Sequence, residues 1–349
     1  MRISNRVRAG VLVTVVAIAV AFAGTSALRA NPAPVLPAVA PAQLLASTLD
    51  ALAGPVTISG DVTTEADLGL PDLPAGLGGD SSGPASLMIG QQRFKVWLSP
   101  DGARVARLLP FDEQDVVANR TDAWIWDSAK MTAAHLSLAA LPAPKAPAAR
   151  VAQVSPPSTA DVLGVARQVL RAVQPYAEVS VDGTARVAGR PVYQLTLTPR
   201  SPLTRIGRIV VAVDSQTLLP LRLQVFARGA EQPAFVAGFT KVSFDPIDAS
   251  TFQFTPPPGA TVTQIDPAKI KATASSNLTQ ITGLKTFGGG FDLRWAMKLS
   301  GPLPAEAAAL LPYAGPLASA ETVEHDGATW LLFGFVDLPT LQLDAGRLP

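Results

Sequence analysis

The chain has 349 residues, with 28 basic and 27 acidic side chains and no cysteine. The absence of cysteine excludes disulfides, thiolate metal sites, a cysteine nucleophile and the lipid-modified cysteine of a bacterial lipoprotein. A net charge of +1 without any basic run gives no reason to expect nucleic acid as a partner. The length allows one large or two ordinary domains with buried cores.

The first thirty residues are typical of a membrane-targeting segment. Arg2, Arg6 and Arg8 precede an uncharged apolar run from Val11 to Ala23, and small residues follow it. We therefore predict a signal peptide or N-terminal anchor at 1–30 and an extracytoplasmic location in a bacterial cell envelope. Cleavage would give a secreted protein. An uncleaved segment is the alternative, because the uncharged stretch approaches the roughly 20 residues that span a bilayer.

The next segments predict a helix followed by antiparallel strands. Residues 31–40 are a Pro/Ala-rich spacer, and leucines at helical spacing in 41–53 indicate a short amphipathic helix. From Val56 to Leu138 the apolar period changes to two, which predicts a meander of short strands. Glycine and proline are too dense at 68–84 for a strand, so we expect a mobile loop there.

A second Pro/Ala-rich linker at 140–157 precedes a predicted helix from Ser158 to Val173. Strands with clear alternation follow, and we expect each to have one apolar face. Prolines cannot donate to a ladder, so Pro256–Gly259 is expected to end the sheet. The region 270–349 is less regular, with predicted strands near 291–299 and 329–335 and a short helix at 305–311.

Two segments resemble the LolA/RseB-type periplasmic lipoprotein carriers and sensors. They are RTDAWIWDSAKMTAAHL at 120–136 and the closing PIDASTFQFTPPPGATV at 246–262. The order helix, strands, helix, strands is also similar, over roughly residues 41–265, and resembles the actinobacterial type of LolA-like protein most. The chain departs from Gram-negative carriers: their arginine-rich strand is not found, and 270–349 is an extension. A literal outer-membrane lipoprotein shuttle is therefore not the expectation.

The resemblance implies an α+β fold. A curved antiparallel β-sheet would form a half-open barrel over 41–265, with helices covering its concave face and a smaller C-terminal α/β extension at 270–349. The concave face would hold acyl chains. The expected ligand contacts are Leu45, Leu49, Trp124, Trp126, Val162, Val169, Leu195, Leu197, Val211, Val213, Leu221, Leu223 and Val225. The alternative is that these residues fill an ordinary core, because alternation indicates a face and not whether it is empty.

Sequence patterns of common enzymes are absent. The chain has only His135 and His325, and it has no Gly-x-Ser-x-Gly, His-Glu-x-x-His, Walker or dinucleotide-binding motif. We therefore expect no catalysis, no cofactor and no metal. The favoured function is an extracytoplasmic carrier that binds an acyl lipid or lipoprotein received from a membrane-protein donor. The alternatives are an envelope-stress regulator that binds the outer domain of an anti-sigma factor, and a secreted hydrolase on a β scaffold.

Overall fold

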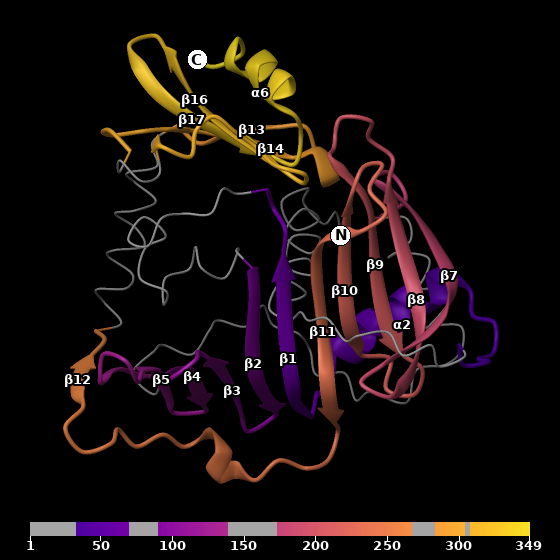
Figure 1. The fold of residues 1–349 in the computed structure, drawn as a ribbon, viewed down its shortest axis with the longest axis vertical. Helices are drawn as coiled ribbons and strands as arrows, with labels where there is room; N and C mark the ends of the chain where they lie inside the picture. The colour runs from indigo at the N-terminus through magenta and orange to yellow at the C-terminus, as the bar shows by residue number, and fades with distance from the viewer. Residues whose placement is uncertain (1–32, 70–89, 139–172, 267–282, 304–307) are drawn as a thin grey trace, which may run out of the picture.

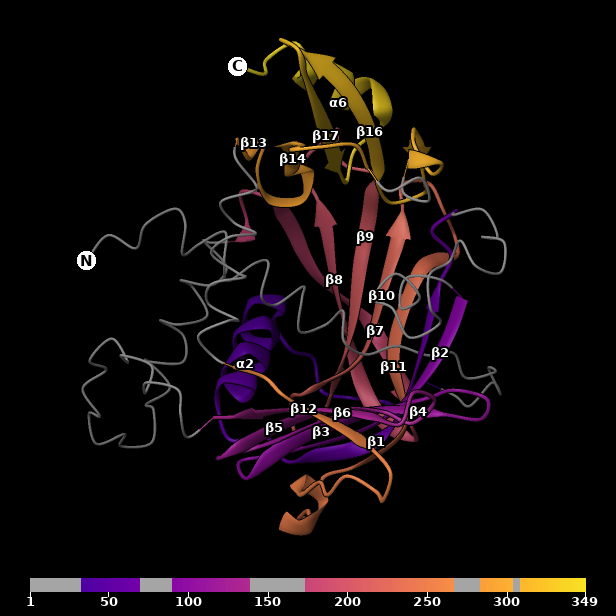
Figure 2. The same cartoon turned by 90° about the vertical axis from the view of Figure 1, so that its left-hand side faces the viewer.

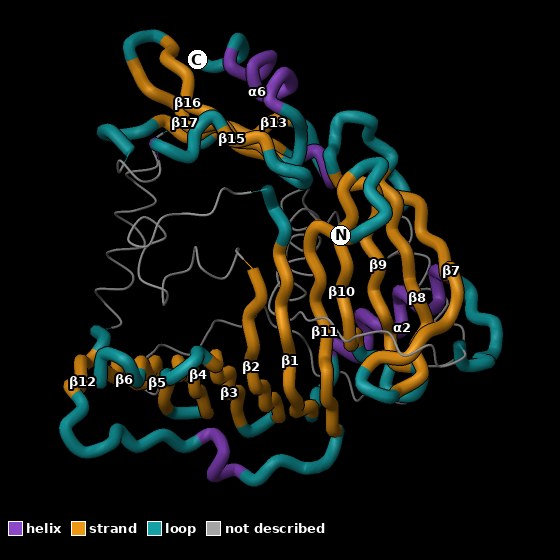
Figure 3. Tube along the Cα trace, in the orientation of Figure 1, coloured by secondary structure: helices purple, strands orange, loops and turns teal. Residues whose placement is uncertain are grey.

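The computed structural model describes residues 33–69, 90–138, 173–266, 283–303 and 308–349. Within these ranges most of the chain is strand, with few helices (Figure 3). Twelve strands in the described residues form one curved sheet with the order β12-β6-β5-β4-β3-β2-β1-β11-β10-β9-β8-β7 (Figure 1). Their bounds are β1 Ile58–Ala66, β2 Gly90–Ser99, β3 Gly102–Leu108, β4 Glu113–Asn119, β5 Asp122–Asp127, β6 Thr132–Ser137, β7 Ala177–Val187, β8 Arg190–Pro199, β9 Ile206–Asp214, β10 Pro220–Ala227, β11 Pro233–Ser243 and β12 Thr261–Gln264.

The pairing of β1 with β11 joins the strands before residue 138 and those from residue 177 on into this single sheet. β1 pairs with β11 in antiparallel register, from Ser59 opposite Ser243 to Ala66 opposite Phe235. The backbones approach so closely that a Cβ at Gly60 would lie 2.0 Å from the Lys241 carbonyl oxygen. Only glycine fits at that position. The sheet is open at both edges, so the predicted α+β fold with a curved, unclosed sheet is confirmed.

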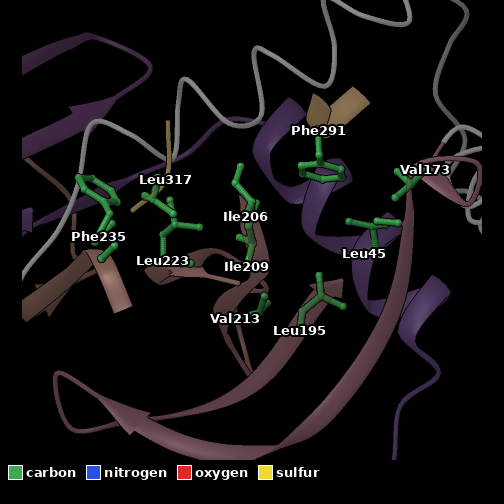
Figure 4. Close-up of a cluster of buried hydrophobic side chains, with 14 of the residues drawn as sticks. Leu45, Val173, Leu195, Ile206, Ile209, Val213, Leu223, Phe235, Phe291 and Leu317 are labelled. Carbon is green, nitrogen blue, oxygen red and sulfur yellow. The ribbon is translucent and has the colours of Figure 1, made fainter. Parts of the chain in front are cut away.

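Helix α2 (Pro41–Ala53) lies against one face of the sheet. Its Leu44 and Leu45 belong to a buried cluster with Leu195, Val213 and Leu223 (Figure 4). Its later residues Ala51 and Leu52 pack against a second cluster that reaches into β1 and β2. Among the described residues, no helix is long and apolar enough to cross a bilayer.

The Pro/Ala-rich segment before α2 lies on the sheet as extended chain. The Thr184 hydroxyl donates to the Pro34 carbonyl at 2.6 Å, and the Tyr193 hydroxyl donates to the Pro37 carbonyl at 3.1 Å. Leu36 packs against the same cluster as Leu45. The described part of the spacer is therefore held against β7 and β8.

The C-terminal extension is a second, five-stranded sheet with a helix on one face. Its strands, in the order β13-β14-β17-β16-β15, are β13 Lys285–Phe287, β14 Arg294–Lys298, β15 Tyr313–Ala314, β16 Ser319–His325 and β17 Ala328–Gly334, and α6 is Leu338–Ala345. Two of these strands and the strand-rich character match the predicted extension. A buried ion pair between Arg294 of β14 and Asp344 of α6 joins the helix to the sheet.

This extension is packed into the larger sheet. Phe291, in the short helix η3 (Gly290–Asp292), and Leu317 belong to the cluster that contains Leu45 and Leu195 (Figure 4). The Ser201 hydroxyl donates to Asp292 at 2.6 Å, and the Thr204 hydroxyl donates to the Phe335 carbonyl at 3.0 Å. The extension therefore contributes side chains to the main core.

The prediction that the sheet ends at Pro256–Gly259 is wrong, because another strand of the same sheet follows these residues. The prolines lie outside strands, but β12 follows them and pairs in parallel with β6, with Thr261 opposite Thr132. Prolines end a strand without preventing the next residues from pairing elsewhere. The connection 244–260, with the short helix η2 (Ala249–Phe252), crosses the sheet to reach that edge (Figure 2).

Several sequence predictions fall outside the described residues. They are the segment 1–30, most of the loop 68–84, the linker 140–157 and the helix from Ser158, including Val162 and Val169. Part of the predicted helix 305–311 also lies there.

Phe252 holds the connection against the sheet. Its side chain is 1% exposed, it lies beside Gly102, and its carbonyl accepts a hydrogen bond from the Asn119 side chain at 3.0 Å. We expect Phe252→Ala to lower the free energy of unfolding by about 3–5 kcal/mol, the usual range for a buried phenylalanine. Phe111→Ala is the matched control, because Phe111 is 99% exposed. Urea unfolding would measure both, and equal effects would contradict the assigned packing.

Candidate ligand-binding face

Strands β2 to β6 form a wing that extends from the core toward the β12 edge. Figure 2 shows α2 on one side of this wing and the connection 244–260 on the other. Val96 shares a buried cluster with Ala51 and Leu52 of α2, so Val96 and the residues in register with it face the α2 side. The strands of the wing pair without register shifts. Alternation therefore assigns every side chain to one face.

Two adjacent rows on the α2 side consist only of apolar residues. We call these two rows the wing face. The first row is Val96, Val105, Val116, Ile125 and Ala134, and the second is Leu98, Ala103, Ala118, Ala123 and Leu136. Exposure rises outward along the first row, from 2% at Val96 to 50% at Val116 and 53% at Ile125. The wing face is thus continuous with the core at Val96, is most exposed at Val116 and Ile125, and is half-buried again at Ala134 and Leu136 of β6.

A third row on the same side is mainly polar. It consists of Phe94, Arg107, Gln114, Asp127 and Thr132. Arg107 donates to the Gln92 side-chain oxygen at 2.8 and 3.2 Å and to that of Gln114 at 3.4 Å. Burial lowers the pKa of Arg107. An apolar face bordered by a buried cation is suited to an amphipathic ligand.

The opposite side of the wing carries Trp124 and Trp126, which are covered by the connection 244–260. Trp124 and Trp126 both pack on Phe254 of the connection, with ring centroids 5.5 and 5.8 Å apart. His135 stacks on Trp124 at 4.1 Å and lies 2.7 Å from Asp122 and 2.8 Å from Gln264 of β12. Hydrogen bonds from Thr121 and His135 lower the pKa of Asp122.

Trp124 and Trp126 therefore lie on the face opposite the predicted concave one. A ligand on the α2 side does not reach them, because the sheet lies between. Period-two alternation separates even from odd positions but does not indicate which set faces the helix. Their role as ligand contacts stays a prediction, and it now requires a ligand under the connection.

A buried ion pair lies on this covered side. Arg104 donates to Asp115, which is 1% exposed, and Arg104 also lies over the Trp97 ring at 5.5 Å. Burial raises the pKa of Asp115, although the charge and hydrogen bond of Arg104 oppose the rise. The pair joins β3 to β4 on the covered side and does not belong to the wing face.

The other predicted contacts lie in or beside a filled core. Leu45, Leu195, Val213 and Leu223 are at most 7% exposed, and they pack together with Phe291 and Leu317 of the extension. The partly buried members at the edge of this cluster are Leu49, Leu197, Val211 and Val225. The structure thus brings eight of the predicted residues into one cluster. Whether they contact a ligand stays a prediction.

Leu221 differs from its neighbours in β10. The β9–β10 register shifts between Pro220 and Arg222, which places Leu221 in the second cluster, with Ala212 and Val192. The expectation of one apolar face for each strand is also wrong for β9, where Val210 and Ala212 are as buried as Ile209 and Val213. A bulge and a strand covered on both faces leave no mark in simple alternation.

The β9–β10 turn is held by Asp214. Its carboxylate is fully buried and accepts hydrogen bonds from Arg190 and from the backbone of Thr217 and Gln216. Burial acts to raise the pKa of Asp214, but these hydrogen bonds outweigh it and lower the pKa. The role of this residue is structural.

A hollow of about 360 Å³ lies where α2 ends. It is lined by Ala51, Pro55, Val56, Thr217, Leu219 and Phe244. None of the predicted ligand contacts lines it. The hollow is wide open, so it offers a ligand less enclosure than a pocket would.

Sequence reasoning missed Val105, Val116, Ile125 and Arg107. The signal was present in the strand patterns at 102–108, 113–119 and 122–127, where small or branched apolar residues alternate with polar or aromatic ones. Pairing the strands in register would have put the aliphatic residues in one row.

Val116 and Val117 are adjacent residues in β4 on opposite faces, with 50% and 1% exposure. We expect Val117→Ala to lower the free energy of unfolding by about 1.5–3 kcal/mol, because two buried methyl groups are lost. Val116→Ala should change it by less than about 0.5 kcal/mol. Urea unfolding of the two variants measures this difference directly. A large loss at Val116 would show that the wing face is covered.

Comparison with known proteins agrees with this architecture. Residues 146–253 match the model of the MucB/RseB N-terminal domain. MucB of Pseudomonas aeruginosa, in its complex with MucA, is 16% identical, with a TM-score of 0.48 over 87% of this chain and 96% of that chain. No curated protein matches.

Two further solved structures are more distant. Lipoprotein LppX of Mycobacterium tuberculosis is 11% identical, with a TM-score of 0.30 over 60% of this chain and 100% of that chain. A LolA superfamily protein of Nitrosomonas europaea is 12% identical, with a TM-score of 0.23 over 62% and 99%. The family match over 146–253 and the curved, unclosed sheet together show that the fold is LolA/RseB-like, as predicted.

Proposed function

We propose that this chain is an extracytoplasmic protein that binds a lipid or lipoprotein and shields its acyl chain on the wing face, without catalysis. The observation that carries the proposal is the exposure of Val116 and Ile125 within two wholly apolar rows. Isolated exposed apolar residues are ordinary, whereas a contiguous apolar face bordered by polar residues is typical of a binding surface.

The dimensions of the wing face suit an acyl chain. Five strands about 4.8 Å apart give the first row a length of about 19 Å across the sheet. Each methylene removed from water contributes about 0.8 kcal/mol, so a long chain gains several kcal/mol even when only one side is covered. A ligand that went deeper would meet Leu45 and Leu195 only by displacing α2, Phe291 or Leu317.

The place of action follows from the N-terminal sequence and the family match. The positively charged, then apolar, segment 1–30 supports export, and the LolA/RseB-like fold supports a role in the cell envelope. We assign ligand binding to the domain 41–265. The extension 270–349 acts as its cap, because Phe291 and Leu317 close the core from that side.

The double variant Val116→Asp/Ile125→Asp tests the lipid-binding proposal. We expect it to weaken binding of a fluorescent fatty acid by about tenfold or more, because the acyl chain would lie against two carboxylates. Both positions are half exposed, so the fold should persist, as circular dichroism would verify. Leu343→Asp is the control: Leu343 is 71% exposed on α6, outside the wing face.

Equal binding by both variants and the unaltered chain would exclude the wing face as the acyl site. Mass spectrometry of an organic extract of the purified protein gives an independent measurement. The absence of any co-purifying acyl species and of fatty-acid binding would contradict lipid binding altogether.

A second candidate function is regulation through contact with the outer domain of an anti-sigma factor. The observation that favours it is an aromatic cluster on the extension. Phe333 and Phe335 are 38% and 37% exposed, and Trp295 stacks on Phe333 at 5.0 Å. These residues lie on the face opposite α6, because Trp330 and Leu332, which alternate with Phe333, pack against Leu341 of that helix.

Deletion of 270–349 would not test this function cleanly, because it would remove Phe291 and Leu317 from the main core. The sharper variant is Phe333→Lys. We expect it to abolish binding to the isolated outer domain of the anti-sigma factor, because aromatic residues dominate such contacts, while fatty-acid binding is retained. Isothermal titration measures both. Unchanged binding to that domain would remove the aromatic cluster from the interface, and Leu343→Lys on the other face serves as the control.

A further inference from the structure

Arg107 lies at the border of the wing face and is 6% exposed. Gln92 and Gln114, both neutral, accept its hydrogen bonds. The orientation of Gln114 is fixed, because its amide nitrogen donates to Asp127 at 3.0 Å and its oxygen must therefore face Arg107. The guanidinium is thus held by a built arrangement of three side chains on neighbouring strands.

Three other largely buried arginines among the described residues each pair with an aspartate. Arg104 pairs with Asp115, Arg190 with Asp214 and Arg294 with Asp344. Across the described ranges Arg107 has no carboxylate within ion-pairing distance. A buried cation without an opposite charge is costly, so such a site favours an anion that arrives from outside.

Arg222 is also buried, but it belongs to the other face. In the register of the sheet, one row runs across β10, β11, β1 and β2 on that face. The row consists of Arg222, Gly238, Thr63 and Arg93. Arg93 alternates with Phe94, whose row is on the α2 side. Of these two arginines, only Arg107 shares a side with the wing face.

Donors remain on Arg107 after its internal bonds are made. A guanidinium has five N–H groups in a fixed fork, and the bonds to Gln92 and Gln114 use three of them, which leaves two. Along β3, Arg107 is two residues from Val105, about 7 Å, on the same side. A head group at Arg107 would therefore place its acyl chain at the start of the apolar rows.

We propose that Arg107, held by Gln92 and Gln114, binds the anionic head group of an acyl lipid whose chain lies on the wing face. This assignment rests on the proposed function and adds to it the class of ligand, a negatively charged amphiphile. A carboxylate or phosphate would each accept two hydrogen bonds from the fork. The acyl chain adds affinity to this contact, because it covers the apolar rows that begin next to Arg107.

The test compares palmitate with methyl palmitate, which has the same chain and no charge. Displacement of a fluorescent fatty acid from the full chain measures both affinities. We expect the unaltered protein to prefer palmitate, and Arg107→Gln to weaken palmitate about tenfold or more while changing the ester less than twofold. Arg93→Gln is the matched control, an exposed arginine on the opposite face of β2. It should change neither.

Further outcomes separate this assignment from its alternatives. Arg107→Lys should retain part of the preference, because it keeps the charge and loses the fork. Inorganic phosphate at millimolar concentration should not displace the fluorescent probe, and efficient displacement would mean a free-anion site and overturn the lipid assignment. Equal affinity of the unaltered protein for palmitate and its ester would also overturn it, even if Arg107→Gln did not fold. Failure of both ligands to bind would instead contradict the proposed function.

Discussion

The pairing of β1 with β11 is the constraint on which the rest of the structure depends. It joins residues about 180 positions apart and turns two strand sets into one sheet. Long-range strand pairing of this kind has a high entropic cost of loop closure, and the buried clusters on either side of β1 must offset it. The close approach at Gly60 shows how tightly the two backbones meet there. Without this pairing, the wing would have no core at its inner end.

The same pairing explains why the two sides of the wing differ. After β11 the chain must cross the sheet to reach β12, and it does so on the side that carries Trp124 and Trp126, where Phe252 and Phe254 bury the surface. On the other side, α2 is thirteen residues long, and its Ala51 and Leu52 pack against the cluster that contains Ile58 of β1 and Val96 of β2. Among the described residues, Val116 and Ile125 on that side are therefore half exposed, although they are apolar.

The sequence predicted where helices and strands lie better than it predicted which side of the sheet each residue faces. The helix at 41–53, the short strands from Val56 to Leu138 and the later strands follow from local periodicity, and the structure contains all of them. The family resemblance added the curved sheet. The sequence did not indicate the relations between distant segments: the pairing of β12 beyond the prolines, the face on which Trp124 lies, and the register shift at Leu221. Each depends on pairing or coverage, which a local pattern does not contain.

The difference between a filled core and an exposed face also decides how a ligand could bind. Most of the residues expected to line a cavity pack against α2 and against Phe291 and Leu317 of the extension, so the core gains its stability from the side chains that would have to move. The wing face needs no such opening. A ligand there would cover apolar side chains, such as Val116 and Ile125, that the described part of the chain leaves half exposed. Binding on the wing face is therefore compatible with a stable core.

The partners of Arg107 are neutral, so an anion could bind there, too, without disrupting an existing interaction of the fold. If an aspartate held this guanidinium, as Asp115 holds Arg104, an incoming anion would have to leave that carboxylate buried and unpaired, at a cost of several kcal/mol. Glutamine oxygens orient the fork without neutralising it, so an anion can bind without displacing another charge. The energy of a buried, uncompensated cation is tolerated in the unliganded protein because three hydrogen bonds reduce it. The uncompensated charge thus lowers the stability of the fold, and an anionic head group bound at the fork, as proposed, would remove that cost.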